Sequence, residues 1–190
     1  MDVAALQTLQ SRIARADASA RRIESPGFQQ SLLLDDGNTH QYSVTGIKSP
    51  EQLEDELLAL FIWVWSLKDH LKEAYRSKGL DVKQVESIAN KSVALQIVSD
   101  IANRAKHGAL RDSRSGKFAE LVKVGYTIPP TAISKITVGA FSVETEVSNP
   151  GEVELHASIE TNDGIMYDAF AVLIEAQTEW ETKALPALID

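Results

Sequence analysis

Apolar residues recur every three or four positions through much of the first hundred residues, which is the spacing of one helix face. The pattern predicts a first helix to about residue 22 and a long second helix from Ser49-Pro50 to Gly79, apolar on all sides in its middle. A short helix is predicted after Asp81. A further helix is predicted over about residues 91–107, with Gly108 at its C-terminal cap.

The spacing changes to alternate positions in two parts of the chain, which indicates β-strands. Ser25-Pro26-Gly27 is predicted to end the first helix, and strands near 29–34 and 39–45 flank an Asp-Asp-Gly-Asn turn. The polar residues at 111–116 predict an exposed loop, after which the alternation returns. Strands are predicted at 119–128, 135–147 and 152–160, and an Asn-Asp-Gly turn at 162–164 begins another hairpin.

The final apolar segment has two interpretations: a closing helix capped by Asp168 and ended by Pro186, or an extension of the strand through Met166. The elements predict an α+β fold, a bundle of about four helices with an N-terminal β-hairpin and a C-terminal antiparallel sheet. Residues 1–116 would be mainly helical and residues 117–190 rich in strands, packed as one compact unit. Open sheet edges lead us to expect a homodimer.

The composition excludes several classes of protein. No cysteine is present, which excludes disulfides, thiol catalysis, thiolate zinc sites and iron–sulfur clusters, and favours a cytoplasmic location. The longest apolar run, Leu57–Trp65, has nine residues, far fewer than the roughly 20 that cross a bilayer, so no membrane association is expected. The sequence has no phosphate-binding glycine loop and no dinucleotide fingerprint, so no cofactor is predicted.

The net charge of −8 comes entirely from the last part of the chain. Residues 117–190 hold four Lys or Arg and twelve Asp or Glu, whereas residues 1–116 hold fifteen of each sign. An acidic half argues against a broad nucleic-acid-binding face there. Any site for an anionic ligand is therefore expected in the helical half.

The helix predicted at 91–107 has a broad apolar side and a narrow polar side. Asp100, Asn103 and His107 lie three and four residues apart on the polar side, so their side chains can touch. These groups have fixed hydrogen-bonding geometry, whereas a merely solvated face is usually rich in Lys and Glu. Two interpretations remain: a solvated helix face, or a polar groove in which Asp100 or Asn103 orients His107.

Basic residues accompany this helix end: Arg104, Lys106, Arg111, Arg114 and Lys117 lie within fourteen positions, against Asp112 alone. Arg grips a phosphoryl group with two donors, so this segment suits RNA or another phosphate-containing ligand. With His107 as acid or base, the same groups would serve metal-free RNA cleavage. The alternative is that these cations only complement the dipole at the helix end.

A metal site has less support in the sequence. Asp69 and His70 of the second helix would approach Asp100 and His107 if the two helices pack side by side. Neither an HExxH nor an HxxxH spacing is present, so no metal is predicted.

The segment DIANRAKHG (100–108) resembles the polar helix of the HEPN superfamily of helical nucleases and nucleotide-binding domains. The resemblance covers about residues 50–110 and implies a helical core; in the nuclease members the site forms where two such helices meet in a dimer. Those members carry Arg, four to six residues and then His, whereas only two residues separate Arg104 from His107. The resemblance implies a non-catalytic interaction or phosphate-binding module, which the spacing favours, or a metal-independent RNA nuclease acting in stress or phage defence.

Overall fold

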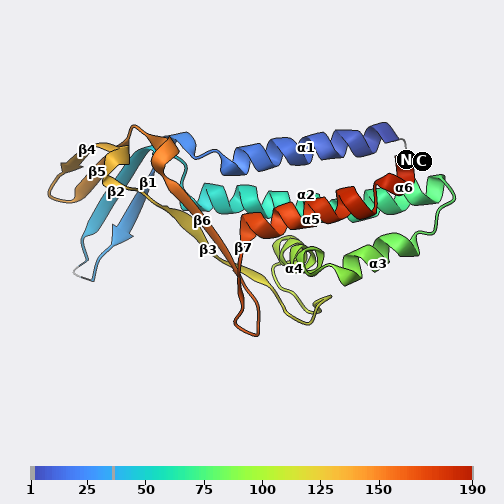
Figure 1. Ribbon diagram of the computed structural model, residues 1–190. Coiled ribbons are helices and arrows are strands. Elements are labelled where there is room, and N and C mark those ends of the chain that lie inside the picture. The colour runs from blue at the N-terminus through green and yellow to red at the C-terminus, as the bar shows by residue number, and fades with distance from the viewer. Residues whose placement is uncertain (1–2, 36, 190) are drawn as a thin grey trace. The chain divides into compact units, whose positions relative to one another are not determined.

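The computed structural model describes residues 3–35 and 37–189 and has a mixed α+β architecture (Figure 1). The chain divides into two compact units, each built from segments that are far apart in the sequence. The helical unit comprises Met1–Ser19, Asp55–Lys123 and Ala157–Asp190, and the sheet unit comprises Ala20–Glu54 and Val124–His156. Each unit thus contains residues from before and after position 116, where the sequence predicted a change from a mainly helical to a strand-rich part.

The helices form where apolar spacing and capping residues coincide. They are α1 (Val3–Arg21), α2 (Pro50–Ser77), α3 (Lys83–Lys91), α4 (Val93–His107), α5 (Ala169–Lys183) and α6 (Pro186–Ile189). Ser49, Ser92 and Asp168 each accept a hydrogen bond from a first-turn backbone N–H, at 3.0, 3.2 and 2.7 Å. Gly108 ends α4 in the left-handed conformation, at φ 74°. The predicted helices are present, and Asp168 begins the closing helix; Pro186, predicted to end that helix, begins the short α6 instead.

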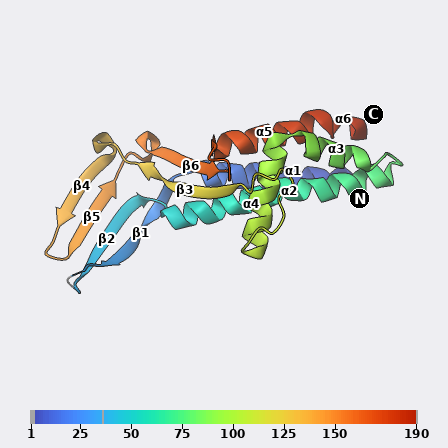
Figure 2. The same ribbon diagram turned by 90° about the horizontal axis from the view of Figure 1, so that it is seen from below.

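The helical unit packs α1 and α5 alongside α2, and α4 against α5 (Figures 1 and 2). One face of α2 is buried, through Leu57, Leu60, Phe61, Val64 and Leu71. The opposite side is less covered, since Ala59 is exposed, so the continuous apolar run does not bury the helix on most sides as predicted. Tyr75 is buried as well and donates its hydroxyl to the Ala184 carbonyl at 2.8 Å. This hydrogen bond ties the end of α2 to the end of α5.

The sheet unit carries a four-stranded sheet in the order β1 (Glu24–Leu33), β2 (Thr39–Ile47), β5 (Ser142–Val147) and β4 (Ile133–Val138). The β1–β2 and β4–β5 pairs are antiparallel, whereas β2 pairs with β5 in parallel. The predicted N-terminal hairpin is thus present, but the C-terminal strands do not all form one antiparallel sheet, because β5 pairs in parallel with β2. The two hairpins join because each has an apolar face, and both bury it in one core that contains Ile47, Ala132, Val147 and Val153.

A second sheet has the order β3 (Glu120–Thr127), β6 (Glu154–Glu160) and β7 (Met166–Asp168), and β6 and β7 form the hairpin predicted at 162–164. Single 3-10 turns at Pro130–Ala132 and Pro150–Glu152 occupy the proline breaks. Pro26-Gly27 lies inside β1 at a shift of register, so this strand begins five residues before the predicted position. Among the described residues, no helix combines the length and apolarity needed to cross a bilayer.

Gly46 is a position at which the sheet unit cannot accept a side chain without distortion. Its φ is +92°, and a Cβ atom would overlap the Val147 carbonyl oxygen where β2 meets β5. We predict that Gly46→Ala lowers the free energy of unfolding by about 3 kcal/mol, measured by urea denaturation. Gly37→Ala is the control, because Gly37 also has a positive φ but nothing within 4 Å of a Cβ atom, and it should cost about 1 kcal/mol. Equal costs would contradict this packing argument.

Candidate functional site

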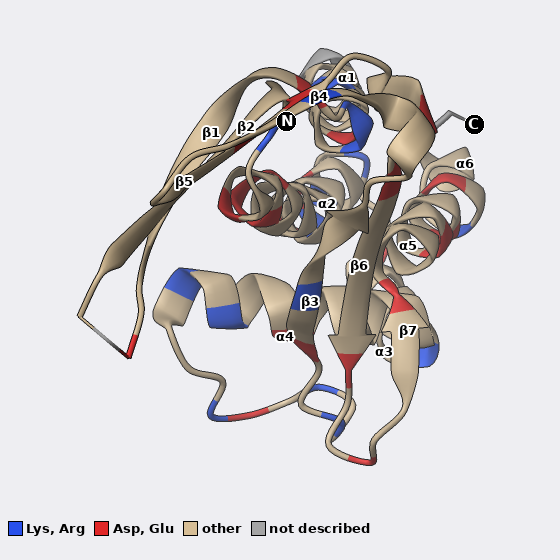
Figure 3. Cartoon of the chain, turned by 90° about the vertical axis from the view of Figure 1, so that its left-hand side faces the viewer, with Lys and Arg blue, Asp and Glu red and all other residues tan. Residues whose placement is uncertain are grey.

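The last two turns of α4 bring the predicted site to the protein surface. The face of α4 from Ala94 to Ala102 is buried within the helical unit. Arg104, Lys106 and His107 follow, and Figure 3 shows basic residues at this end of the helix. Since an amphipathic helix buries only one side, Lys106 and His107 are exposed.

Asp100 does not lie on a solvated face, because it is only 1% exposed. Its Oδ2 accepts hydrogen bonds from the Ser113 hydroxyl at 2.6 Å and the Ala119 N–H at 3.2 Å. Its Oδ1 is buried without a hydrogen-bond partner among the described residues. Asp100 therefore fastens the loop between α4 and β3 to the helix. The loop is mostly exposed, as predicted, but Ser113 within it is partly buried.

Arg104 also holds this part of the fold. Its Nη1 lies 3.3 Å from Glu120 Oε2 at the start of β3. Its Nε is buried and has no hydrogen-bond partner within the described part of the chain. Asp100 and Arg104 together hold the chain from Ser113 to Glu120 against α4.

Asn103 and His107 line the surface itself, where two open hollows adjoin. One hollow is lined by Asn103, His107, Leu110, Arg111 and Asp112, and the other adds Trp65, Lys68, Asp69, Lys106 and Arg114. The two are called the α4 hollow below. The Asn103 Nδ2 lies 3.5 Å from Ser99 Oγ, at the limit of a hydrogen bond, so the Asn103 amide remains available to a ligand. Asp100 lines neither hollow.

The α4 hollow is locally positive in a chain with a net charge of −8. It is lined by four Lys or Arg and two Asp: Lys68, Lys106, Arg111, Arg114, Asp69 and Asp112. Lys106 and Arg111 are exposed, and no ion pair or hydrogen bond joins their side chains to another described residue. These two cations are therefore available to an anion.

The other two cations of the hollow contact Glu86 of α3. Its carboxylate lies 2.9 Å from Arg114 Nη1 and 3.7 Å from Lys68 Nζ, and Lys72 Nζ donates to it at 2.7 Å. Burial of the Glu86 carboxyl opposes ionisation, but the hydrogen bonds from Lys72 and Arg114 prevail and lower its pKa to about 2. Burial lowers the pKa of the Lys68 amine, against the pull of Glu86. Lys68 and Arg114 thus belong to a network that shapes the hollow.

Trp65 packs beneath these two cations. Lys68 Nζ lies 4.5 Å and Arg114 Cζ 5.2 Å from the centroid of its ring, within the range of cation–π attraction. Trp65 itself is 6% exposed, so it supports the cations rather than offering a stacking surface. Arg114 is thereby held by Glu86, by the Asn90 side chain and by Trp65.

The predicted site residues fall into three groups. Asn103, Lys106, His107 and Arg111 line the hollow, Arg114 lines it while bound to Glu86, and Asp100 and Arg104 hold the loop. Trp65, Lys68 and Glu86 were not foreseen as site residues. They come from α2 and α3, and nothing in their local sequence points to α4. The sequence contained one indication that α2 contributes to the site: Asp69 was expected to lie near His107. Both residues line the hollow.

No metal site accompanies this arrangement in the described residues. They contain no group of three or more His, Cys, Asp or Glu side chains placed to hold a metal ion. Asp69 and His107 share the hollow, but Asp100 is turned to Ser113 and Ala119. The hollow holds four cations, an amide and an imidazole against two carboxylates, a balance that suits an anionic ligand.

We predict that Asp100→Ala lowers the free energy of unfolding by about 2–4 kcal/mol, because the Ala119 N–H and the Ser113 hydroxyl lose their acceptor. Urea denaturation followed by circular dichroism measures the change. Asp112→Ala is the matched control, since Asp112 is exposed, and it should change stability by less than about 0.5 kcal/mol. A loss below about 1 kcal/mol for Asp100→Ala would show that the carboxylate does not anchor the loop.

Glu86→Gln should lower the free energy of unfolding near neutral pH by about 1–2 kcal/mol, through weaker hydrogen bonds to Lys72 and Arg114. The pKa of Glu86 is about 2 in the folded protein and 4.5 ordinarily, so its stabilisation is complete above 4.5 and is lost as pH falls through 2. The difference from wild type should therefore shrink across that window in urea denaturation curves. Glu175→Gln, at an exposed position, is the control. A difference independent of pH would refute the ionic network.

Comparisons of the chain with models of protein families, with curated proteins and with solved structures find no match. The likeness of residues 100–108 to the HEPN superfamily is therefore untested by any relative. What supports a function is the geometry and charge of the α4 hollow.

Proposed function

We propose that this protein is a non-catalytic phosphate-binding module, whose ligand is RNA or another phosphate-containing molecule. The observation that carries the proposal is the excess of cations in the α4 hollow, four Lys or Arg against two Asp, in a chain of net charge −8. Such a local reversal of charge attracts anions to one place on an otherwise acidic protein. The absence of cysteine favours a cytoplasmic setting.

Lys106 and Arg111 are the residues assigned to the phosphate. Both are exposed, lack ion-pair partners among the described residues and line the hollow together with Asn103 and His107. An Arg guanidinium binds phosphate oxygens with two parallel donors, and a Lys ammonium adds a mobile charge. The Asn103 amide supplies a neutral donor. Lys68 and Arg114, restrained by Glu86, form the wall of the same site.

The nuclease alternative draws its support from His107, which is exposed in the hollow beside the cations. Metal-free cleavage needs that imidazole to be oriented as well. Asp100 is hydrogen-bonded to the loop, Asn103 lies at hydrogen-bonding distance only from Ser99, and Arg104 pairs with Glu120. The described residues thus give His107 no orienting partner, which favours binding over cleavage.

The HEPN-like core and the homodimer belong to the same proposal. In that superfamily two polar helices meet across a dimer, and an exposed α4 end offers such a surface. A second copy placed there would bring Lys106 and Arg111 of both chains to one ligand. Phosphate binding as proposed requires only a single copy.

We predict that a fluorescent single-stranded RNA oligonucleotide binds the protein at low salt, measured by fluorescence anisotropy. The double variant K106A/R111A should bind about tenfold more weakly and lower the slope of log K against log salt by about 1.4, because two phosphate contacts are lost. K91A/R15A removes the same charge at exposed positions outside the hollow and should leave binding unchanged. The RNA should be recovered intact with EDTA present.

Three results would count against the proposal. Absence of RNA binding at low salt would refute RNA as the ligand. Equal loss in K106A/R111A and K91A/R15A would mean that net charge, not the hollow, governs binding. Cleavage of the RNA that disappears in His107→Ala would replace the non-catalytic proposal with the nuclease alternative.

A further inference from the structure

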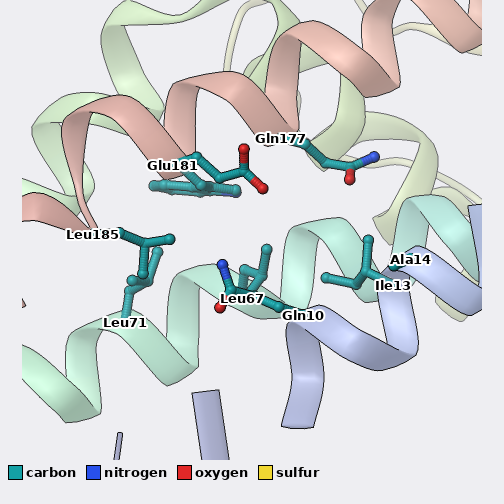
Figure 4. Close-up of a pocket in the computed structure, with 9 residues that line it drawn as sticks. Gln10, Ile13, Ala14, Leu67, Leu71, Gln177, Glu181 and Leu185 are labelled. Carbon is teal, nitrogen blue, oxygen red and sulfur yellow. The ribbon is translucent and has the colours of Figure 1, made fainter. Parts of the chain in front are cut away.

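The cavity in the helical unit is too small for an organic ligand. It lies between α1, α2 and α5, and Figure 4 shows Leu67 and Leu71 of α2 across from Gln177 and Glu181 of α5. Its volume is about 70 Å³, whereas a cavity that binds benzene measures about 150 Å³. The sheet unit, in contrast, leaves an extended apolar surface uncovered.

The four-stranded sheet has an apolar face, which its strand pairing defines. Paired residues on neighbouring strands lie on the same side of a sheet, as do residues two apart on one strand. Tyr42 pairs with Gln30 of β1 and with Val143 of β5, and Val143 pairs with Val138 of β4. The outer part of this side, towards the hairpin turns, is called the apolar sheet face below and contains Leu32, His40, Tyr42, Ile136, Val138 and Phe141.

The apolar sheet face continues the core of the sheet unit but is itself exposed. Phe28, Val44 and Val147 lie on the same side of the sheet and pack in that core. Further out, the exposed fractions of the five large apolar and aromatic residues range from 37% at Tyr42 to 74% at Val138. Together these five expose roughly 500 Å², in the upper part of the range for the largest patch on a monomeric protein. A patch of this size is typical of an interaction site.

The charges of the sheet unit restrict the partner. Its two segments, Ala20–Glu54 and Val124–His156, contain four Lys or Arg and nine Asp or Glu. Such an acidic unit repels nucleic acid and anionic lipid surfaces. The apolar sheet face contains no charged residue, whereas the opposite face exposes Lys135, Glu144 and Glu146. Two copies related by a two-fold axis can thus join through the apolar sheet face without setting like charges against each other.

We propose that a second copy of this chain covers the apolar sheet face, with the two sheets packed face to face. Sheets packed in this way interdigitate the side chains of their inner faces. A stable dimer buries about 800 Å² on each partner, and the apolar residues approach that area together with their polar neighbours Gln30 and His40. The proposal gives the expected homodimer an interface on the sheet unit and does not depend on phosphate binding.

Sedimentation velocity of the full chain at about 50 µM measures the association, because interfaces of this size bind in the micromolar range or more tightly. We expect wild type to have twice the monomer mass of 20.8 kDa. Val138→Lys should weaken dimerisation at least about tenfold, since it would bury an unpaired ammonium at the interface. Thr137→Lys adds the same charge on the opposite face of β4 and should remain dimeric. Circular dichroism verifies that each variant is folded.

Two further variants separate the sheet from charge effects and from the α4 hollow. Phe141→Ser removes an aromatic ring from the apolar sheet face without adding a charge, and it should also weaken the dimer. K106A/R111A should stay dimeric. Dimerisation should persist as salt rises, because the interface is apolar, whereas RNA binding weakens.

The proposal is overturned if wild type sediments as a monomer, or if Val138→Lys and Phe141→Ser both sediment as wild type does. Equal dissociation in Thr137→Lys would show that added charge, not the apolar sheet face, controls association. Loss of the dimer in K106A/R111A alone would place the interface at the end of α4 and would overturn the proposal as well.

Discussion

The buried carboxylate of Asp100 sets the position of the loop that follows α4, and residues of this loop line the candidate site. Burial of a carboxylate is costly unless donors replace the water that it loses. Here a hydroxyl and a backbone N–H, from Ser113 and Ala119, provide that replacement. The loop held in this way presents Arg111 and Arg114 to the α4 hollow. Asp100 therefore positions residues that line the α4 hollow, although Asp100 does not line the hollow itself.

A second constraint divides the cations of the hollow into two kinds. The Glu86 carboxylate pairs with Arg114 and Lys72. Hydrogen bonds from these two side chains lower the pKa of Glu86 to about 2, so its carboxylate stays charged until the pH falls to that value. Lys68 and Arg114 are thus held over Trp65, whereas Lys106 and Arg111 extend into solvent. A wall of paired cations beside exposed, unpaired ones suits recognition of a phosphate group better than proton transfer, which needs an oriented acid or base.

Local chemistry made much of the fold predictable from the sequence. The helix ends at Ser49, Gly108 and Asp168 follow from hydrogen bonds within a single turn, and the turns of the β1–β2 and β6–β7 hairpins follow from short polar runs. The single strand predicted at 135–147 is instead the β4–β5 hairpin, whose turn has no such polar run. The parallel pairing of β2 with β5 could not be foreseen, because it joins segments about a hundred residues apart through a shared core. No pattern within either hairpin specifies that partner.

The candidate site was predictable to the same extent. Helical spacing placed Asn103 and His107 on one face, and both line the hollow. The same spacing grouped Asp100 with them, yet Asp100 is buried, because the loop that covers it returns from further along the chain. The network of Glu86 with Lys68 and Arg114 joins three separate segments and was invisible for the same reason.

Mapping the RNA contact by NMR tests the central claim most directly. Addition of a short single-stranded RNA to ¹⁵N-labelled protein should shift the side-chain amide signals of Asn103 and the backbone signals of Lys106 to Arg111, with saturation at a common affinity. The indole signal of Trp180, which does not line the α4 hollow, should stay in place. Shifts confined to other segments, or none at all at low salt, would contradict the assignment of the α4 hollow as the phosphate site.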